Sequence, residues 1–341
     1  MTPSLHRFVV RALVACAGAA LVASASAQPL DKVKVRLDWT PWGVQAAEHL
    51  AQQKGWYKAA GLDVQLEDGN GSVTTVQIVG SGDDFDVGHA ALGPMMIARD
   101  KGLPVKAIAV FARTSDLGML VPTNSGIKGP QDLKGKKVAY TAGSLEAPFI
   151  EPFLAAGGVK RSDMELVNVD ATAKAATYVS GRADAVFSTI PFFEAIVAQA
   201  RPSNAILFAD YKLPMPSFGL FTTESKLASK REPIAKFASV TSAAWQYIYN
   251  GHEDEAVDAV IAQRPQAKLD KKIVRGQIES LRRFFQLPVA AGRTLGDPVP
   301  SDFSDAVKSL TTVGLLHSIK DPADFYVTGL VRPMANISSP K

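Results

Sequence analysis

The fold is decided by residues 33–67, VKVRLDWTPWGVQAAEHLAQQKGWYKAAGLDVQLE. We expect a strand over residues 33–39, followed by an amphipathic helix over residues 45–60 that ends at Gly61. A second strand then covers residues 62–67. A strand, a helix and a strand in this order indicate a β-α-β unit.

This order of elements occurs twice along the chain. The first copy continues with a helix over residues 72–79, a short strand over 85–89 and a helix that starts near Pro94. The turns that precede the third strand of each copy also match, with GSGD at 80–83 and SGRAD at 180–184. The elements expected in the second copy are strands 137–141, 164–169 and 185–188 and helices 145–156 and 173–179.

Strands that alternate with helices specify an α/β fold with a parallel sheet covered on both faces, and ligands bind beyond the carboxyl ends of such strands. Two such lobes can face each other across a cleft, with residues 119–124 and 218–223 as the crossings. Helices such as 234–249 and 272–285 would pack back on the first lobe. We therefore predict a signal peptide over residues 1–27, a first lobe formed by residues 28–120 and 222–341, and a second lobe formed by residues 121–221.

The N-terminus resembles an export signal. His6, Arg7 and Arg11 are basic, an apolar run follows, and Ala25-Ser26-Ala27 has the small-x-small pattern of a cleavage site. We expect cleavage after Ala27 and a periplasmic protein. The alternative is a lipoprotein anchored at Cys16, although few apolar residues precede that cysteine.

Composition excludes several functions. The formal net charge of +4 includes Arg7 and Arg11, so the exported form has no strongly basic surface for nucleic acid. Cys16 is the only cysteine, so the exported form has no disulfide and no thiol nucleophile. His89 has no second ligand at metal-binding spacing, and no later stretch is long and apolar enough to span a membrane. We expect a monomer without cofactor or metal.

Several motifs resemble solute-binding proteins related to the sulfonate/taurine and thiamine-pyrimidine-precursor receptors (the SsuA/NMT1-like family). The matching stretches, which run from about residue 33 to 221, are LDWTP at 37–41, KGWYKAAGLDV at 54–64, DVG at 86–88, GPQDLKGKKV at 129–138 and SGRADA at 180–185. The resemblance implies a type II periplasmic-binding fold with two doubly wound lobes joined by a two-strand hinge. It also implies a small-molecule solute, bound by hinge closure, and delivery to a cognate permease and ATPase of an ABC importer in the inner membrane.

The family binds several kinds of solute. LDWTP, Glu146 and Glu194 favour the pyrimidine-precursor branch, whereas a sulfonate would be repelled by a carboxylate at Glu146. A sulfonate or taurine receptor remains the alternative. Fungal pyrimidine synthases share the fold and use a cysteine-rich segment, which the exported form of this chain lacks.

Candidate ligand-binding residues of the first lobe follow its strands. Trp39 and Trp42 can stack on a planar solute, and Asp38 either accepts hydrogen bonds from the solute or ties down its own loop. His89 ends the predicted third strand, next to Ala90, and is either a ligand contact or a structural histidine.

In the second lobe, Ser144 is a candidate N-cap of the helix that contains Leu145 and Glu146, where free N–H groups suit an anionic or carbonyl group. Ser188 and Thr189 follow the last strand and should face the cleft. Glu194 lies one helical turn further on. Phe187, Phe192 and Phe193 are expected in the core.

Proteins of other classes remain as alternatives. Residues 69–74, GNGSVT, mimic a dinucleotide fingerprint but lack its third glycine, although their backbone N–H groups could contact a solute. A periplasmic hydrolase would need a nucleophile elbow, and no Gly-x-Ser-x-Gly motif is present. A sensory binding protein that signals to a membrane receptor has the same sequence features as a transport receptor.

Overall fold

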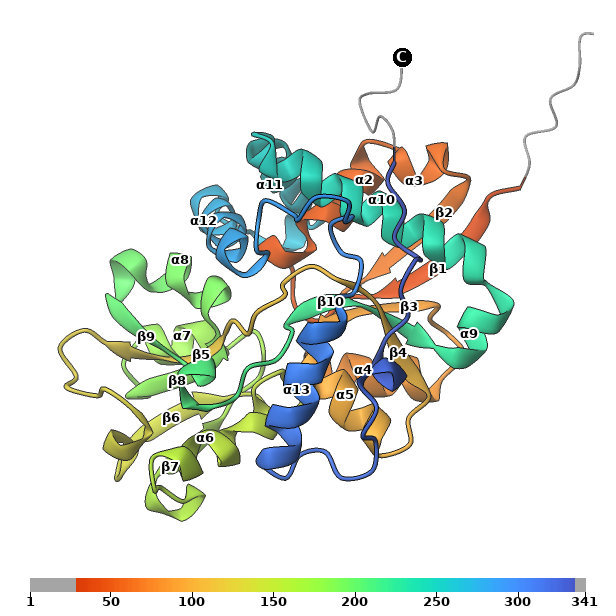
Figure 1. Cartoon of the computed structure of the whole chain (residues 1–341). Helices are drawn as coiled ribbons and strands as arrows, with labels where there is room; N and C mark the ends of the chain where they lie inside the picture. The colour runs from red at the N-terminus through yellow and green to blue at the C-terminus, as the bar shows by residue number, and fades with distance from the viewer. Residues whose placement is uncertain (1–28, 335–341) are drawn as a thin grey trace, which may run out of the picture. The chain divides into compact units, whose positions relative to one another are not determined.

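The computed structural model describes residues 29–334, so the predicted signal peptide, its cleavage site and Cys16 lie outside the described residues. Residues 31–334 belong to one compact unit. This unit contains two five-stranded sheets, labelled in Figure 1. We call them sheet A and sheet B, and each sheet with its covering helices is a lobe.

Sheet A has the strand order β2-β1-β3-β10-β4 and sheet B has the order β7-β6-β8-β5-β9. The first three strands in each order are parallel, while β10 and β5 run antiparallel to both of their neighbours. Strand bounds in sheet A are β1 (Asp31–Arg36), β2 (Leu62–Glu67), β3 (Val87–Ala91), β4 (Val105–Val110) and β10 (Phe218–Thr223). In sheet B they are β5 (Leu117–Pro122), β6 (Lys137–Tyr140), β7 (Glu165–Asn168), β8 (Ala185–Thr189) and β9 (Ser203–Leu207).

Helices cover the sheets in the order expected from the repeat. The helices between the strands are α2 (Ala46–Gln53), α3 (Trp56–Ala59), α4 (Ser72–Ser81), α5 (Leu92–Asp100), α6 (Ile150–Ala156), α7 (Lys174–Val179) and α8 (Ile190–Ala200). The C-terminal segment adds α9 (Glu224–Ser229), α10 (Arg231–Tyr249), α11 (Glu253–Gln263), α12 (Lys271–Leu281) and α13 (Pro300–Thr312). Short 3-10 turns connect several of them, including Gly43–Gln45 and Ala147–Phe149.

Two expected helices begin or end elsewhere. The helix expected over residues 45–60 is broken at Gly55, whose φ of 72° leaves the helical region. The helix expected from Leu145 begins only at Ile150, after a 3-10 turn. Ser144 therefore does not cap a long helix.

The predicted crossings were wrong. Residues 119–124 overlap β5 and residues 218–223 are β10, so both segments belong to sheets. The chain instead passes between the sheets at residues 111–116 and 208–217. Strands β5 and β10 run antiparallel to their neighbours, so each sheet is mixed, whereas the repeat alone predicted a parallel sheet.

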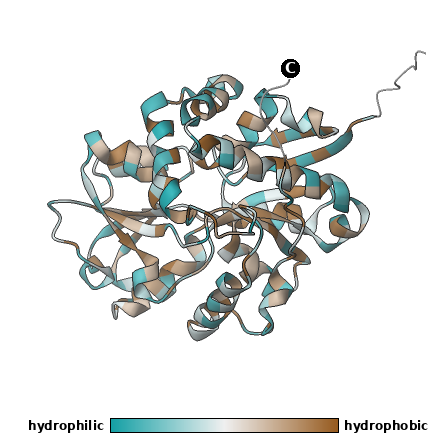
Figure 2. Ribbon diagram, turned by 45° about the horizontal axis from the view of Figure 1, so that its top comes forward, coloured by the Kyte–Doolittle hydropathy of each residue, from teal (hydrophilic) through white to brown (hydrophobic). Residues whose placement is uncertain are grey.

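The C-terminal helices have two different roles. Helix α10 packs on α2 and β1 of the first lobe, as expected. Helix α12 packs on α11 and on the Gly43–Gln45 turn of the first lobe, as expected, and also on α8 of the second lobe, beside which it lies in Figure 1. One contiguous cluster of buried apolar residues runs through both lobes. Figure 2 shows hydrophobic residues concentrated on the strands and hydrophilic ones on outward parts of the helices.

Candidate functional site

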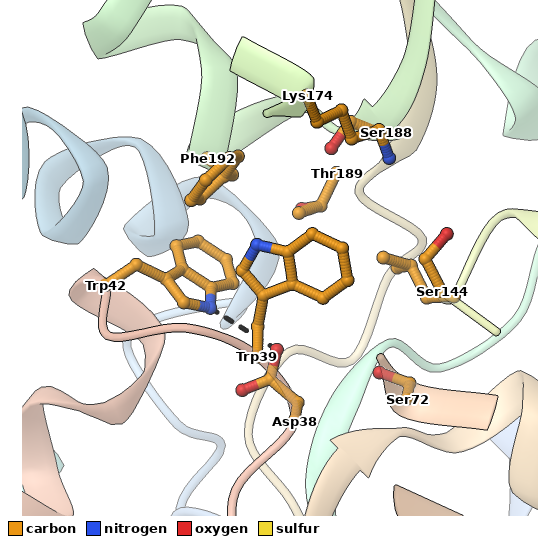
Figure 3. A pocket seen from close by; sticks show the side chains of 10 residues that line it. Asp38, Trp39, Trp42, Ser72, Ser144, Lys174, Ser188, Thr189 and Phe192 are labelled. Carbon is orange, nitrogen blue, oxygen red and sulfur yellow. Dashed lines mark hydrogen bonds between the residues drawn. The ribbon is translucent and has the colours of Figure 1, made fainter. Parts of the chain in front are cut away.

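A cavity lies between the two lobes, at the carboxyl ends of β1, β6 and β8 (Figure 3). It contains about 270 Å³ of space not filled by atoms, part of it open to solvent. The first lobe and the second lobe each supply one wall. The lining residues are Asp38, Trp39, Trp42, Ser72, Ser144, Leu145, Lys174, Ser188, Thr189 and Phe192.

Asp38 is held by neutral donors in the first wall. Gln45 Nε2 donates to its Oδ1 at 2.9 Å, and Trp42 Nε1 donates to its Oδ2 at 3.3 Å. Burial raises the pKa of Asp38 to about 7, although both hydrogen bonds oppose the rise. The carboxyl therefore changes protonation near neutral pH and leaves acceptor positions for a solute.

The loop that carries Asp38 and Trp39 is fixed by the glycine loop that follows β2. Gly71 N donates to the Asp38 carbonyl at 2.7 Å, and Gly69 N donates to the Trp39 carbonyl at 3.1 Å. A Cβ on Gly69 would lie 2.1 Å from the Leu37 carbonyl oxygen, so only glycine allows this approach. The N–H groups of Gly69 and Gly71 therefore hold the wall and do not face a solute.

Aromatic side chains form one side of the cavity and come from both lobes. The Trp42 ring meets Phe192 edge to face at 5.4 Å between centroids, and Trp39 meets Phe192 at 6.5 Å. Phe192 was expected in the core but lines the cavity instead. The site can therefore bind a flat solute between aromatic side chains of the two lobes.

The second wall carries a buried ion pair. Lys174 Nζ donates to Glu146 Oε1, and both side chains are almost completely buried. Burial lowers the pKa of Lys174, and the Glu146 carboxylate opposes that effect. Lys174 Nζ also lies 5.6 Å from the centroid of the Trp39 ring. Glu146 does not line the cavity and Lys174 compensates its charge, so Glu146 does not repel an anionic solute as expected.

Hydroxyl groups complete the second wall. Thr189 Oγ1 donates to Asp116, and Ser144 Oγ donates to the Thr141 carbonyl at 2.7 Å. Burial raises the pKa of Asp116 to about 6, while hydrogen bonds from Ser217 and Thr189 lower it. Ser188 adds a hydroxyl beside Thr189 at the end of β8 (Figure 3).

The structure brings most of the predicted site residues together. The predicted residues that line the cavity are Asp38, Trp39, Trp42, Ser144, Leu145, Ser188 and Thr189. His89, Ala90, Glu146 and Glu194 do not line it. Strand β3 ends at Ala91 and not at His89, so His89 is fully buried, with Nδ1 3.2 Å from Glu48 Oε1. Burial lowers the pKa of His89 to about 3 and raises that of Glu48 to about 8, so both are neutral at pH 7.

Glu194 lies at the contact between α8 and α12. Its Oε2 accepts from Ser280 Oγ and from Arg283 Nη2, each at 2.6 Å. Nearby, Gln277 Oε1 accepts from Gly43 N and Gln277 Nε2 donates to the Phe192 carbonyl. Helix α12 thus connects the Trp42 loop of one lobe to α8 of the other.

The lobes also touch where the glycine loop after β2 meets Gly143 of the second lobe. Thr74 N donates to the Gly143 carbonyl at 3.2 Å. Gly71 has a φ of 152°, and a Cβ there would lie 2.2 Å from the Gly143 oxygen. Both contacts join the first lobe to the second.

Sequence reasoning missed Ser72, Lys174, Phe192 and the supporting Gln45. A lysine at the start of a short helix normally faces solvent, and its partner Glu146 lies 28 residues away, so no local pattern marks the pair. Within residues 29–334 no group of three His, Cys, Asp or Glu side chains is placed to hold a metal ion. No helix in this part of the chain is long and apolar enough to cross a membrane.

The chain is similar in sequence to a family of known proteins. A family model described as "NMT1/THI5 like" matches residues 44–256, more than half of the chain. The formylaminopyrimidine-binding protein of Halalkalibacterium halodurans is 25% identical over 246 residues, which cover 70% of this chain and 73% of that protein. A 4-amino-5-hydroxymethyl-2-methylpyrimidine phosphate synthase of Saccharomyces cerevisiae is 27% identical over 231 residues, or 64% of this chain and 67% of that protein.

A solved structure confirms the predicted periplasmic-binding fold. The periplasmic aliphatic sulphonate binding protein of Escherichia coli superposes with a TM-score of 0.64, covering 91% of this chain and 96% of that one. Its sequence is 15% identical, so this similarity concerns the fold alone.

Proposed function

Because the chain belongs to the NMT1/THI5-like family, we propose that it is a periplasmic solute-binding protein of an importer. Its solute is a small planar nitrogen heterocycle of the aminopyrimidine class. The observation that carries this proposal is the Asp38 carboxyl, which lines an aromatic cavity and is held only by the neutral donors Gln45 and Trp42.

An aminopyrimidine matches this carboxyl in its donor and acceptor pattern. Its ring nitrogen accepts and the adjacent amino group donates, so the edge pairs with a neutral carboxylic acid through two hydrogen bonds. If the ring takes the proton, the same edge pairs with the carboxylate. The raised pKa of Asp38, about 7, makes both forms accessible near neutral pH.

An alkanesulfonate fits this wall poorly. It presents only acceptor oxygens, and an ionised Asp38 would repel it. The ammonium of Lys174 could attract it from the other wall, but Glu146 already compensates that charge. The similarity of this chain to a formylaminopyrimidine-binding protein supports the same choice.

Binding couples to closure of the lobes. A solute on the Asp38–Trp39 wall gains contacts from Ser188, Thr189 and Phe192 only when the lobes approach, and the passages 111–116 and 208–217 act as the hinge. Closure also forms the contacts of Gly71 with Gly143 and of Glu194 with α12. The closed surface then docks on a membrane permease with its ATPase, and the leader over residues 1–27 directs export.

The synthase relative from yeast raises the alternative of an enzyme. The walls of the cavity carry hydroxyls, one lysine and one carboxyl, but no cysteine or histidine lines it. We propose binding without turnover. A solute recovered unchanged after long incubation with the protein supports this, and a converted product contradicts it.

Calorimetric titration of the exported form, refolded to remove carried-over ligand, tests the proposal. The solutes are 4-amino-5-hydroxymethyl-2-methylpyrimidine, a formylaminopyrimidine and taurine. We expect the pyrimidines to bind and to raise the melting temperature, and taurine to do neither. Taurine binding without pyrimidine binding would replace the proposal with a sulfonate receptor.

Replacement of Trp39 separates the binding role from a packing role. Trp39→Ala removes an indole that covers the solute, so we expect Kd to rise by about 30-fold or more, on the order of 2 kcal/mol for one buried aromatic surface. Trp56→Ala is the matched control, because Trp56 is as deeply buried (6% exposed against 7%) but lies outside the cavity. Equal loss of binding in both variants would make Trp39 a packing residue.

A further inference from the structure

The hydroxyl of Thr189 is held by a buried carboxyl outside the cavity. Thr189 is the last residue of β8 and lines the wall that faces Trp39 and Trp42 (Figure 3). Its Oγ1 donates to Asp116 Oδ2. The N–H of the next residue, Ile190, donates to the Asp116 carbonyl at 2.8 Å. Asp116, which does not line the cavity, thus holds two consecutive residues of the second wall.

The Asp116 carboxyl determines the direction of these bonds. It is completely buried, and its other oxygen, Oδ1, accepts from Ser217 Oγ. Burial raises the pKa of Asp116 to about 6, which still leaves the group ionised at pH 7. A carboxylate has no hydrogen to donate, so the hydroxyls of Thr189 and Ser217 must both donate to it.

The Thr189 hydroxyl can therefore only accept a hydrogen bond from a solute. A hydroxyl has one hydrogen and two lone pairs, and the hydrogen of Thr189 is already used. Ser144 is constrained in the same way, because its Oγ donates to the Thr141 carbonyl at 2.7 Å. The ammonium of Lys174 is a donor on this wall, so the wall combines acceptors with a donor.

The direction of the Thr189 bond does not depend on closure of the lobes. Asp116 directly precedes β5, and Thr189 pairs with Leu117 at the start of that strand. Both partners are therefore fixed at one edge of sheet B, whatever the position of the first lobe. The polarity of the hydroxyl is set before a solute arrives.

We propose that Asp116 is a positioning residue that makes Thr189 an obligate acceptor, so that the protein selects a solute whose group beside Thr189 carries a hydrogen. The inference rests on the proposed function, because the solute occupies the same cavity. It narrows the solute class to heterocycles with a second N–H or O–H group, apart from the edge that pairs with Asp38. An ether or carbonyl oxygen beside Thr189 would place lone pairs against lone pairs and weaken binding.

Calorimetric titration of the exported form with matched solutes tests the inference. The solutes are 4-aminopyrimidines that carry an amino, a methyl or a methoxy group on one other ring carbon, with each free ring carbon tried in turn. Amino and methyl groups are similar in size, but only the amino group donates. At the position that faces Thr189, we expect the amino solute to bind about tenfold more tightly than the methyl solute. The methoxy solute should bind no better than the methyl solute.

Variants of Thr189 separate the hydrogen bond from other effects of the amino group, which also makes the ring more basic. Thr189→Val keeps the shape and removes the hydroxyl, so it should abolish this tenfold preference and leave the methyl solute bound as before. Thr189→Ser keeps the hydroxyl and should keep the preference. A residue with a packing role alone would weaken the binding of all solutes alike.

Variants of Asp116 test the positioning role. Asp116→Leu removes the acceptor, so the Thr189 hydroxyl can turn and donate to a methoxy oxygen. We expect the affinity for the methoxy solute to rise about threefold or more relative to the amino solute. Asp116→Ala makes the same test with a smaller side chain, and thermal melting shows which variants are folded. Ser217→Ala is the matched control, because it removes only the other donor to Asp116, from outside the cavity, and should keep the wild-type order of affinities.

The outcomes distinguish this inference from the proposed function. If pyrimidines bind but Thr189→Val removes no preference for amino over methyl at any position, the inference is wrong and the function stands. The inference is also wrong if the folded Asp116 variants bind methoxy solutes as weakly as the wild type does.

A second matched pair covers the alternative solute class. If only sulfonates bind, the function is wrong, and the inference is decided by taurine and propanesulfonate, which differ by an amino group in place of a methyl group. A preference for taurine that Thr189→Val removes would support the inference, and its absence would overturn it. If neither class of solute binds, both the function and the inference are wrong.

Discussion

The two walls of the cavity each hold a buried carboxyl, and they neutralise it in different ways. On the first wall Asp38 is held by Gln45 and Trp42, and burial raises its pKa to about 7. On the second wall the Glu146 carboxylate is paired with the ammonium of Lys174. One carboxyl is neutralised by a proton, the other by a permanent counter-ion.

This difference separates a binding wall from a supporting wall. A carboxyl that exchanges a proton near neutral pH can pair with a solute that supplies or shares that proton. A carboxylate with its own lysine is already satisfied and serves to hold the Ser144 turn in place. The contrast predicts that changes on the second wall alter stability most, and changes on the first alter pH dependence.

The largest effect is expected from Lys174→Met. The variant leaves Glu146 buried without its counter-ion, so we expect the free energy of unfolding to fall by about 3–5 kcal/mol. Urea denaturation followed by circular dichroism measures this loss. The double variant Lys174→Met, Glu146→Gln removes both charges and should recover most of it. A single variant as stable as the wild type would show that the pair is not formed in solution.

The next effect is on the pH dependence of stability, tested with Asp38→Asn. The pKa of Asp38 is about 7 in the folded protein and 3.8 as its ordinary value, so the folded state binds more protons between these values. The contribution of Asp38 to the free energy of unfolding of the wild type therefore falls as the pH rises from about 4 to 7, and it stays low above pH 7. Relative to the wild type, the variant should gain stability over that range, by at most about 1.4 kcal/mol per pH unit.

Comparison of the two proteins isolates Asp38 from its neighbours. Asp116 and Glu48 also have raised pKa values, about 6 and 8, but both remain in the variant. Their contributions largely cancel in the difference. Urea denaturation at pH 4.5, 6.0 and 7.5 gives that difference, and a value independent of pH would mean that Asp38 is ionised throughout.

The smallest effect is expected outside both walls, from Glu194→Ala. The side chain is one-third exposed, so loss of its bonds to Ser280 and Arg283 should cost below about 1 kcal/mol. Because these bonds join the lobes, solute affinity should fall by up to about fivefold, and small-angle scattering without solute should show a larger radius of gyration. Glu279→Ala, which removes only an exposed pair with Arg275 on the same helix, should change neither.

Helices and strands were predicted well where the hydrophobic pattern of the sequence agrees with the glycines that mark the ends of elements. Strand β2 has the predicted bounds, and α7 ends at Val179 as expected from Gly181. The crossings failed because β5 and β10 are buried apolar runs that carry no sign of which sheet they join. Their partners lie far away in sequence, as with Leu220 beside His89.

In the site, residues directly after strands were predicted and residues brought in by packing were not. Trp39 follows β1 and Thr189 is the last residue of β8, so their positions at strand ends indicated the cavity. His89 failed because β3 continues two residues further. Lys174 and Glu194 are decided by partners on other elements, Glu146 and α12, and a single sequence does not show such pairs.

The order of strands within the sheets also sets an order of folding. Sheet B is complete once residues 117–207 are available, because all of its strands lie in that segment. Sheet A has β10 between β3 and β4, so it waits for residues 218–223 and must close a loop of more than a hundred residues. During synthesis from the N-terminus, the second lobe can therefore fold before the first. The Asp38 wall is synthesised earliest, but it is among the last parts of the molecule to make its final contacts.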